Sequence, residues 1–270
     1  MNTPSLAILG CGNIGSAIAK GLAQSTDYPS GSITLTRRKA AQLVEFQESG
    51  FNTTADNGAA VKNSEIILIS VAPGQLMALL DEITSSLTMD HLLISVVSGV
   101  NISEIQGKVG SDIPVVRAMP NTAAGLCESI TCLASVPGFE KGLATANALF
   151  DHVGKTLHID EEQMASATAL GACGVAFFLR AIRAASQGGI EIGFHSDEAF
   201  TIAAQTARGA ATLILNNQAH PEAEIDRVTT PMGATIAGLN EMEHQGFSSA
   251  MIRGITTSTE KVSKLFNKDS

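Results

Sequence analysis

The stretch "LAILGCGNIGSAIAKGL", residues 6–22, decides the fold of the first part of the chain. Gly10, Gly12 and Gly15 form the pattern G-x-G-x-x-G between a short apolar run and an amphipathic run. This spacing is typical of a dinucleotide site: the first glycine permits a tight turn, the second lets backbone approach a diphosphate, and the third lets helix pack on strand. The alternative is a strand-to-helix turn with a purely structural role.

Short apolar runs alternate with helical stretches beyond this motif. Several of the runs are apolar throughout, which is typical of strands buried on both faces of a parallel sheet. We therefore predict a doubly wound α/β domain. Its predicted strands cover residues 6–9, 32–36, 65–71, 92–97, 115–119, 130–134 and 155–159. Its predicted helices begin near Asn13, Lys39, Asn57, Gln75, Ser103 and Phe139.

The pattern changes after Asp160, where Ala-rich segments with helical spacing replace the strand-like runs. One predicted helix covers 161–189 and ends at Gly188 and Gly189; another covers 196–217, with Ser196 or Asp197 as its N-cap. The sequence thus predicts two domains, an α/β domain over 1–160 and an all-α domain over 161–270.

Composition excludes several classes of function for this chain of 270 residues. Its 17 Lys and Arg residues against 26 Asp and Glu give a net charge of -9, which argues against a nucleic-acid partner. The contiguous apolar runs are shorter than the roughly 20 residues that span a bilayer, so no membrane association is expected. The four cysteines match no zinc pattern. We expect no metal, reduced thiols and a cytoplasmic location.

The second predicted strand ends in "LTRRK", which bears on the choice of cofactor. An NAD site usually has an acidic residue there that accepts hydrogen bonds from the ribose hydroxyls. Thr36, Arg37, Arg38 and Lys39 instead offer a hydroxyl and three cations, and guanidinium groups bind phosphate dianions in a bidentate manner. This indicates NADPH, with NADH as the less favoured donor; the alternative is a solvated helix start.

Two further strands end in loops at the same predicted edge of the sheet. They are "VAPGQ" at 71–75 and "RAMPNTAA" at 117–124. Ligands bind at the carboxyl ends of strands in open α/β sheets, so Pro73, Met119 and Asn121 are candidate walls of a nicotinamide pocket. A loop proline and a buried methionine also have ordinary structural explanations.

The segment "DRVTTPMGATIAGL" at 226–239 is the richest stretch outside the predicted sheet. Its threonines, proline and glycine precede an apolar helical run. The backbone N–H groups of Gly233, Ala234 and Thr235 are expected to point out of a helix N-terminus, which suits a small carboxylate. The alternative is a capped helix after a proline turn.

Taken together, "ILGCGNIGSAIAKGL", "TRR", "VAP", "MPNT", "IAAQTARGAATLIL" and "VTTPMGATIAGL" resemble the pyrroline-5-carboxylate reductase family over almost the whole chain. The last motif is the specific one. The resemblance implies a Rossmann-like cofactor domain and a helical domain through which subunits form dimers, and in some members decamers. It also implies NAD(P)H-dependent reduction of L-1-pyrroline-5-carboxylate to L-proline in proline biosynthesis.

The resemblance also implies the site residues. A cofactor site follows from Gly10, Gly12, Asn13, Ile14, Gly15, Thr36, Arg37, Arg38, Asn57, Val71, Ala72, Pro73, Met119 and Asn121. A substrate site follows from Asn121, Thr230, Gly233, Ala234 and Thr235. The sequence departs from the family pattern in three places: Met232 replaces a glycine of the substrate loop, "GACGVAF" at 171–177 lacks the proline and the tyrosine of the family's "SGSGPAY", and Ala72 replaces a lysine.

Thr235 is the candidate catalytic residue, whose hydroxyl would hydrogen-bond the imine nitrogen that gains a proton. No His, Lys or carboxylate stands out as a general acid. One alternative function is a β-hydroxyacid or 6-phosphogluconate-type dehydrogenase, which would need a lysine on the first long helix; residues 161–189 contain none. Another is a non-catalytic NADP-binding sensor, which Met232 would favour.

Overall fold

The structure of the chain is a computed structural model that describes residues 4–266. Contacts divide the described residues into two units. The first consists of the described parts of Met1–Ala172 and Ser258–Ser270, and the second is Cys173–Thr257. The predicted domain boundary lies between residues 160 and 161, whereas residues 161–172 and 258–266 group with the α/β unit.

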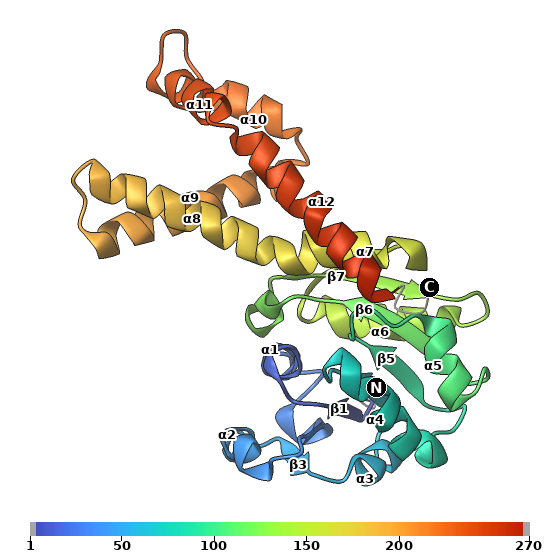
Figure 1. The fold of residues 1–270 in the computed structure, drawn as a ribbon. Coiled ribbons are helices and arrows are strands. Elements are labelled where there is room, and N and C mark those ends of the chain that lie inside the picture. The colour runs from blue at the N-terminus through green and yellow to red at the C-terminus, as the bar shows by residue number, and fades with distance from the viewer. Residues whose placement is uncertain (1–3, 267–270) are drawn as a thin grey trace. The chain divides into compact units, whose positions relative to one another are not determined.

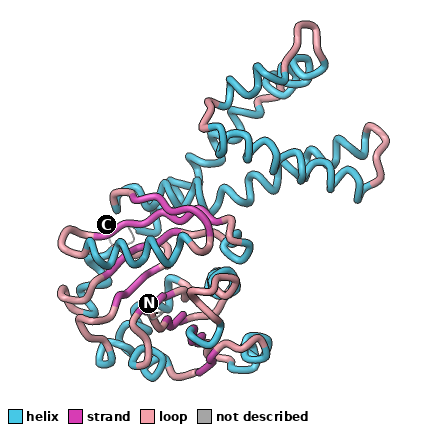
Figure 2. Tube along the Cα trace, turned by 180° about the vertical axis from the view of Figure 1, so that it is seen from behind, coloured by secondary structure: helices cyan, strands magenta, loops and turns pink. Residues whose placement is uncertain are grey.

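The first unit is built on one sheet of eight strands in the order β3-β2-β1-β4-β5-β6-β7-β8 (Figures 1 and 2). Its first six strands have the order expected of a doubly wound dinucleotide-binding fold, so that prediction is confirmed. The strands are β1 (Leu6–Leu9), β2 (Ile33–Thr36), β3 (Asn52–Thr54), β4 (Ile66–Ile69), β5 (Leu92–Ser95), β6 (Val115–Met119), β7 (Ser129–Ser135) and β8 (Gly154–His158).

Helices cover both faces of this sheet. One face packs on α1 (Asn13–Leu22) and α6 (Glu140–Asp151). The other packs on α3 (Asn57–Lys62), α4 (Leu76–Ile83) and α5 (Ile102–Val109). Strands β1 and β4 are wholly buried, as their uninterrupted apolar sequences predict. A short helix α2 (Val44–Glu48) lies between β2 and β3.

The pairing of β6 with β7 departs from an all-parallel sheet. These two strands are antiparallel, with Met119 opposite Cys132, whereas the other strand pairs are parallel. Only a short loop with one 3-10 turn, Thr122–Leu126, joins them. A parallel pair would need a crossover of a dozen residues or more, so the short connection forces the chain to reverse.

From Glu161 to the last described residue, 266, the elements are all helical, as predicted after Asp160. They are α7 (Met164–Ala167), α8 (Gly174–Glu191), α9 (Ser196–Asn217), α10 (Pro221–Val228), α11 (Ala234–His244) and α12 (Phe247–Phe266). A 3-10 turn, Glu161–Gln163, precedes α7, and a π-helical segment, Thr168–Cys173, joins α7 to α8. Helices α8 and α9 pack against each other within the second unit.

The predicted break at Gly188 and Gly189 is wrong, because α8 continues through both residues. A Cβ on Gly189 would lie 2.9 Å from the Cβ of Ala199, so Gly189 permits the close approach of α9. The helix ends instead before Gly193, whose φ of +110° is disfavoured for other residues. The predicted N-cap of α9 is also wrong by one or two residues: His195 holds that place, and its backbone N–H donates to Glu198.

Candidate functional site

A cleft of about 570 Å³ opens at the carboxyl ends of β1, β2 and β4. Eight residues predicted to bind the cofactor line it: Gly10, Gly12, Thr36, Arg37, Arg38, Asn57, Val71 and Ala72. The sheet brings them together from four segments, the carboxyl ends of β1, β2 and β4 and the start of α3, because neighbouring parallel strands end at the same edge. The position of this cleft is the one expected for a nucleotide ligand in an open α/β sheet.

The three glycines of the loop after β1 have different environments. Gly10 has φ +95°, and a Cβ there would lie 2.7 Å from Val71 Cγ1. A Cβ on Gly15 would lie 2.5 Å from Ser70 Oγ and 2.7 Å from the carbonyl oxygen of Gly10. A Cβ on Gly12 would meet no heavy atom within 4 Å. Thus Gly10 and Gly15 are required by the fold itself, whereas Gly12 keeps space open in the cleft.

Helix α1 begins at this loop and leaves its first N–H groups available. Gly12 is the N-cap, and no side chain hydrogen-bonds to the helix start. The first turn contains no acidic residue, and the N-terminus of a helix carries a partial positive charge. Uncapped N–H groups beside the open space at Gly12 fit an anion such as a diphosphate.

A chain of hydrogen bonds fixes the floor of the cleft. The backbone amide of Cys11 donates to the carbonyl oxygen of Thr36 at 2.9 Å, which ties the glycine loop to β2. The hydroxyl of Thr36 donates to Asn57 Oδ1 at 2.6 Å, and Asn57 Nδ2 donates to Glu82 Oε1 at 3.1 Å. Thr36 is 2% exposed, so its role is to hold the loop and the Asn57 side chain in place.

Three cations follow Thr36 at the rim of the cleft. Arg37 is half-buried, while Arg38 and Lys39 are exposed, and all three line the cleft. Arg37 also lies close enough to Cys11 to favour its thiolate electrostatically. No Asp or Glu is among the residues that line this cleft. The electrostatic character of the rim therefore suits a phosphate monoester better than a bare ribose hydroxyl.

Six other residues predicted to bind the cofactor do not line this cleft: Asn13, Ile14, Gly15, Pro73, Met119 and Asn121. Met119 is 5% exposed and packs on Cys132 and Met164. Asn121 is buried at the end of β6, two strands away from β4. Its Nδ2 donates to the carbonyl oxygen of Gly171 at 3.0 Å and its Oδ1 accepts from the amide of Ala123 at 2.9 Å. These contacts give Asn121 a structural role; its predicted part in ligand binding stays a prediction.

Four residues that line the cleft were not predicted to bind the cofactor: Cys11, Gln42, Ser70 and Gln75. Lys39 also lines the cleft, and the sequence indicated it only as one of the three cations after Thr36. Cys11 lies between Gly10 and Gly12, so the glycine motif itself could have indicated that it lines the cleft. Ser70 and Gln75 flank the "VAP" segment. Gln42 comes from the 3-10 turn Ala40–Leu43, and nothing in its local sequence distinguishes it from other surface glutamines.

Burial raises the pKa of the Cys11 thiol above its ordinary value of 9.0, and burial does the same for Cys132. The folded state therefore holds these protons more tightly than the unfolded state. Their contribution to stability is fully present below pH 9.0 and is lost as pH rises through the folded-state pKa values.

We accordingly expect the thermal midpoint to fall between pH 8 and pH 10 because the unfolded chain releases these protons first. The thermal midpoint of the C11A/C132A double variant is expected to fall less steeply with pH than that of the unchanged chain, when the two proteins are compared by calorimetry over this range. A C127A/C173A variant is the matched control, because those two thiols are less buried. Equal slopes for the double variant and the unchanged chain would contradict the prediction.

The predicted substrate loop lies in the helical unit and forms a tight turn. The amide of Gly233 donates to the carbonyl oxygen of Thr230 at 2.9 Å, with Pro231 and Met232 between them. Met232 has φ +59°, the left-handed conformation that position i+2 of a type II turn requires and glycine adopts more easily. Its side chain is fully exposed in the single chain.

This turn leads directly into α11. Gly233 is the N-cap, and no side chain hydrogen-bonds to the first turn of the helix. A Cβ on Gly233 would lie 2.5 Å from Thr230 Oγ1, so the turn leaves no room for a side chain there. The structure thus brings Thr230, Gly233, Ala234 and Thr235 together at one uncapped helix N-terminus, as the sequence predicted.

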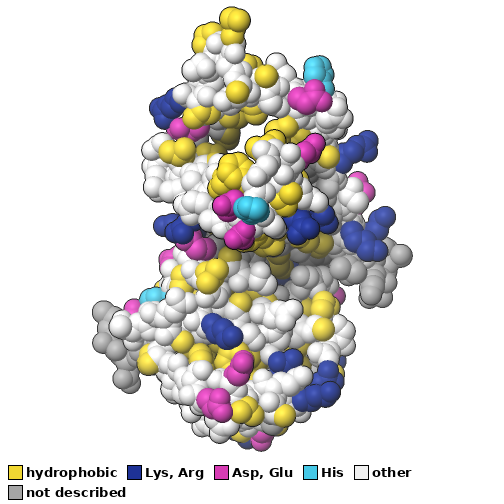
Figure 3. Space-filling model, turned by 90° about the vertical axis from the view of Figure 1, so that its left-hand side faces the viewer, with side chains coloured by type: hydrophobic (Ala, Val, Ile, Leu, Met, Phe, Trp, Pro, Cys, Tyr) yellow, Lys and Arg dark blue, Asp and Glu magenta, His cyan; other side chains and the backbone are white. Residues whose placement is uncertain are grey.

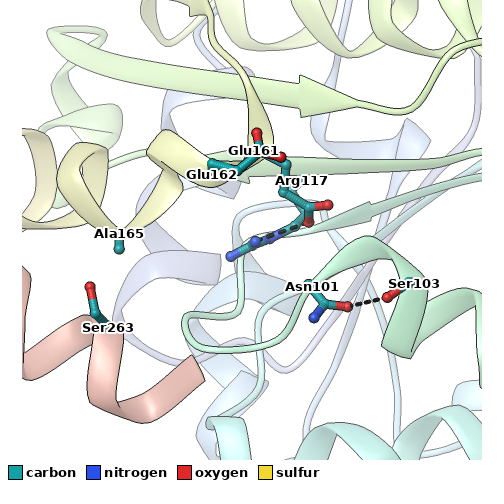
Figure 4. A pocket seen from close by; sticks show the side chains of 7 residues that line it. All are labelled: Asn101, Ser103, Arg117, Glu161, Glu162, Ala165 and Ser263. Carbon is teal, nitrogen blue, oxygen red and sulfur yellow. Dashed lines mark hydrogen bonds and ion pairs between the residues drawn. The ribbon is translucent and has the colours of Figure 1, made fainter. Parts of the chain in front are cut away.

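A second cavity in the α/β unit, of about 450 Å³, surrounds the buried Arg117 on β6 (Figure 4). Arg117 Nη1 donates to Glu161 Oε1 at 3.0 Å, and the same oxygen accepts from the amide of Ile102 at 2.7 Å. Burial lowers the pKa of Arg117, and Glu161 partly opposes that shift. Asn101 caps α5 beside this pair. The carboxylate of Glu161 therefore accepts hydrogen bonds both from Arg117 on β6 and from the first residue of α5.

Large apolar side chains lie on the surface of the helical unit (Figure 3). Those at least 45% exposed on α8, on α9 and in the connection between them are Phe178, Leu179, Ile190, Ile192, Phe194, Phe200, Ile202, Leu213 and Leu215. Exposed apolar surface of this extent is typical of an interaction site. Across residues 4–266 there is no group of three or more His, Cys, Asp or Glu side chains that could hold a metal ion.

Two family models and several curated relatives match this chain. Residues 161–265 match the family model "Pyrroline-5-carboxylate reductase dimerisation", and residues 5–99 match "NADP oxidoreductase coenzyme F420-dependent". Pyrroline-5-carboxylate reductase 2 of Dictyostelium discoideum is 50% identical over 97% of this chain and 93% of its own. Reductase 1 of the same organism is also 50% identical over 97% of this chain, which spans only 50% of that longer protein.

Solved structures of the same family share the fold. The Plasmodium falciparum pyrroline carboxylate reductase with NADP bound superposes with a TM-score of 0.89 at 24% identity, covering 99% of this chain and 100% of its own. The Coxiella burnetii pyrroline-5-carboxylate reductase has a TM-score of 0.87 at 26% identity, covering 98% and 99%. These likenesses support both the Rossmann-like unit and the helical dimerisation unit.

One described helical stretch, Glu161–Glu191, is long and apolar enough to cross a membrane by length and composition alone. Only 17% of its most apolar window is buried in the single chain. The same residues fall inside the match to the dimerisation family model. A single helix of this kind is weak evidence for a membrane protein.

Proposed function

The chain belongs to the pyrroline-5-carboxylate reductase family, and from this membership we propose that it reduces L-1-pyrroline-5-carboxylate to L-proline. The reaction adds a hydride to the carbon of the C=N bond and a proton to its nitrogen. When bound, NADPH supplies that hydride and is released as NADP+. The observation that carries the proposal is the 50% identity to a curated reductase over nearly the full length of both chains.

The cleft residues fit the proposed cofactor. The diphosphate would lie at Gly12 and the uncapped start of α1, where an added Cβ would meet no protein atom. Arg37, Arg38 and Lys39 would hold the 2′-phosphate at the rim. Holding a donor and an acceptor in reactive geometry is worth up to roughly 7–11 kcal/mol of barrier, so orientation is the main contribution expected from the protein.

The turn Thr230–Gly233 and the start of α11 are proposed to hold the substrate. The carboxylate would accept hydrogen bonds from the N–H groups of Ala234 and Thr235, which no side chain caps. The hydroxyl of Thr235 would hydrogen-bond the ring nitrogen. Because a threonine hydroxyl is too weak an acid to release its own proton, we expect the proton to come with the protonated imine or through water.

NADPH is proposed as the preferred donor, and the Arg37→Glu variant tests that choice. A glutamate there would repel a 2′-phosphate and accept hydrogen bonds from a ribose hydroxyl. We expect the ratio of kcat/KM for NADPH to that for NADH to fall at least about tenfold, which equals 1.4 kcal/mol. Lys62→Glu, at the far end of α3, is the charge-matched control. An unchanged ratio in Arg37→Glu would refute the assignment of the 2′-phosphate to this rim.

Self-association through the helical unit follows from the dimerisation match, and we propose that the dimers assemble further into decamers in the cytoplasm. The exposed apolar residues of α8 and α9 support the dimer. The free cysteines Cys11, Cys127, Cys132 and Cys173 support a reducing compartment. Light scattering after size exclusion distinguishes two subunits from ten, and cell fractionation tests the location.

The proposed activity is tested by following the NADPH concentration with a panel of substrates, because NADPH is consumed when an imine is reduced and is formed when a hydroxyacid is oxidised. We expect turnover with L-1-pyrroline-5-carboxylate and none with β-hydroxyacids plus NADP+. Pyrroline without a carboxylate is the matched control, since it tests whether the carboxylate is needed. Turnover only with hydroxyacids would favour a β-hydroxyacid dehydrogenase, and tight NADPH binding without any turnover would favour a sensor; either result would overturn the proposal.

A further inference from the structure

Ser70 follows β4 directly and lies buried beneath the glycine loop, with 7% of its surface exposed. Its hydroxyl donates a hydrogen bond of 2.7 Å to the carbonyl oxygen of Gly10. The same oxygen accepts a hydrogen bond of 2.8 Å from the amide of Gly12. The two acceptor positions of this carbonyl are therefore both used inside the protein.

The orientation of this carbonyl matters for an anionic ligand. A carbonyl oxygen turned toward the cleft would repel a diphosphate, because both carry negative charge. We propose that Ser70 is a positioning residue: its hydroxyl holds the Gly10 carbonyl away from the cleft, so that N–H groups face the diphosphate of the cofactor. The inference rests on the proposed function, since it assigns Ser70 to the same NADPH site.

The packing around Ser70 suits this role. A Cβ on Gly15 would lie 2.5 Å from Ser70 Oγ, so the hydroxyl occupies space that the absent side chain of Gly15 leaves free. Serine is the smallest residue that places a hydroxyl donor there. Alanine would keep the volume of the backbone and Cβ but leave the Gly10 carbonyl without its side-chain donor.

The test compares Ser70→Ala with Ser95→Ala by calorimetric titration of three ligands. Ser95 is the matched control because it ends β5, pairs with Ile69 and is 1% exposed, yet its hydroxyl contacts Val97 rather than the glycine loop. NADPH and 2′,5′-ADP both carry a 5′-phosphate that would contact the loop. 2′-AMP carries only the phosphate proposed to bind Arg37 and Arg38.

We expect Ser70→Ala to weaken NADPH and 2′,5′-ADP about three- to tenfold, the effect of one lost hydrogen bond, while 2′-AMP binds as before. The KM for NADPH is expected to rise by the same factor with kcat unchanged. Ser95→Ala should alter none of these values. Affinity for 2′-AMP also shows that the Ser70→Ala protein is folded.

Equal weakening of all three ligands, or no weakening of NADPH and 2′,5′-ADP, would overturn the role of Ser70 while leaving the proposed function intact. Failure of the unchanged chain to bind NADPH would instead overturn the proposed function, and this inference with it. The two failures are therefore distinguishable in one set of titrations.

Discussion

Substituting Gly12 by valine should weaken NADPH binding far more than it weakens the fold. Gly12 has φ −88° and ψ −158°, which valine adopts readily, and its Cβ would project into open space. In the complex, that space is proposed to hold the diphosphate. Crowding of this kind costs up to about 3 kcal/mol, so we expect the Kd for NADPH to rise about 100-fold. Replacing the glycine N-cap of α1 should lower the free energy of unfolding by no more than about 1 kcal/mol in urea titrations.

Two further variants sharpen this prediction. Gly15→Ala should do the opposite and destabilise the protein, because its Cβ would lie 2.7 Å from the backbone carbonyl oxygen of Gly10. Gly107→Val is the matched control, since Gly107 also borders open space but lies on α5, away from the cleft. An unaltered NADPH affinity in Gly12→Val would show that the diphosphate does not bind at this loop.

Neutralising Glu161 should give the largest loss of stability among the charged residues discussed. Arg117 is 2% exposed, and the side chain of Glu161 at 3.0 Å is 26% exposed. Removing one partner of a buried pair leaves a charge in a medium that solvates it poorly. We expect Glu161→Gln to lower the free energy of unfolding by about 3 kcal/mol in urea titrations at fixed protein concentration.

A double variant separates this electrostatic cost from a loss of shape. Arg117→Met combined with Glu161→Gln removes both charges and retains an oxygen that can accept from the amide of Ile102, so it should be more stable than Glu161→Gln alone. Asp81→Asn, which breaks the exposed pair with Lys108, is the control and should cost no more than about 1 kcal/mol. If Glu161→Gln costs no more than Asp81→Asn, the buried pair does not stabilise the fold (Figure 4).

Most of the sheet and the floor of the cleft were predictable from local sequence. The run Ile66–Ile69 can bury its apolar side chains on both faces only if helices cover both sides of the sheet. The glycine spacing of residues 10–15 is typical of the turn between the first strand and the first helix of a dinucleotide-binding fold. The place of Arg37, Arg38 and Lys39 at the cleft was predictable too, because they directly follow a predicted strand whose carboxyl end lies at the ligand-binding edge of the sheet.

Features that depend on distant residues were not predictable. Strand β3, Asn52–Thr54, has a short polar sequence and forms because β2 offers it an edge. The sequence predicts that Gly189 ends a helix, whereas the structure shows that it allows the close approach of Ala199 on α9. Ser70 and its hydrogen-bond partner Gly10 are 60 residues apart in the sequence, and they meet only because β4 pairs with β1.

The central claim is that this chain transfers a hydride from NADPH to the ring of its substrate, and isotope labelling tests it most directly. The full chain would be incubated with L-1-pyrroline-5-carboxylate and NADPH carrying deuterium at C4 of the nicotinamide, separately on each face. We expect one of the two labels to appear in L-proline at the former C=N carbon. Unlabelled proline from both, or no proline from a chain that binds NADPH, would contradict the account.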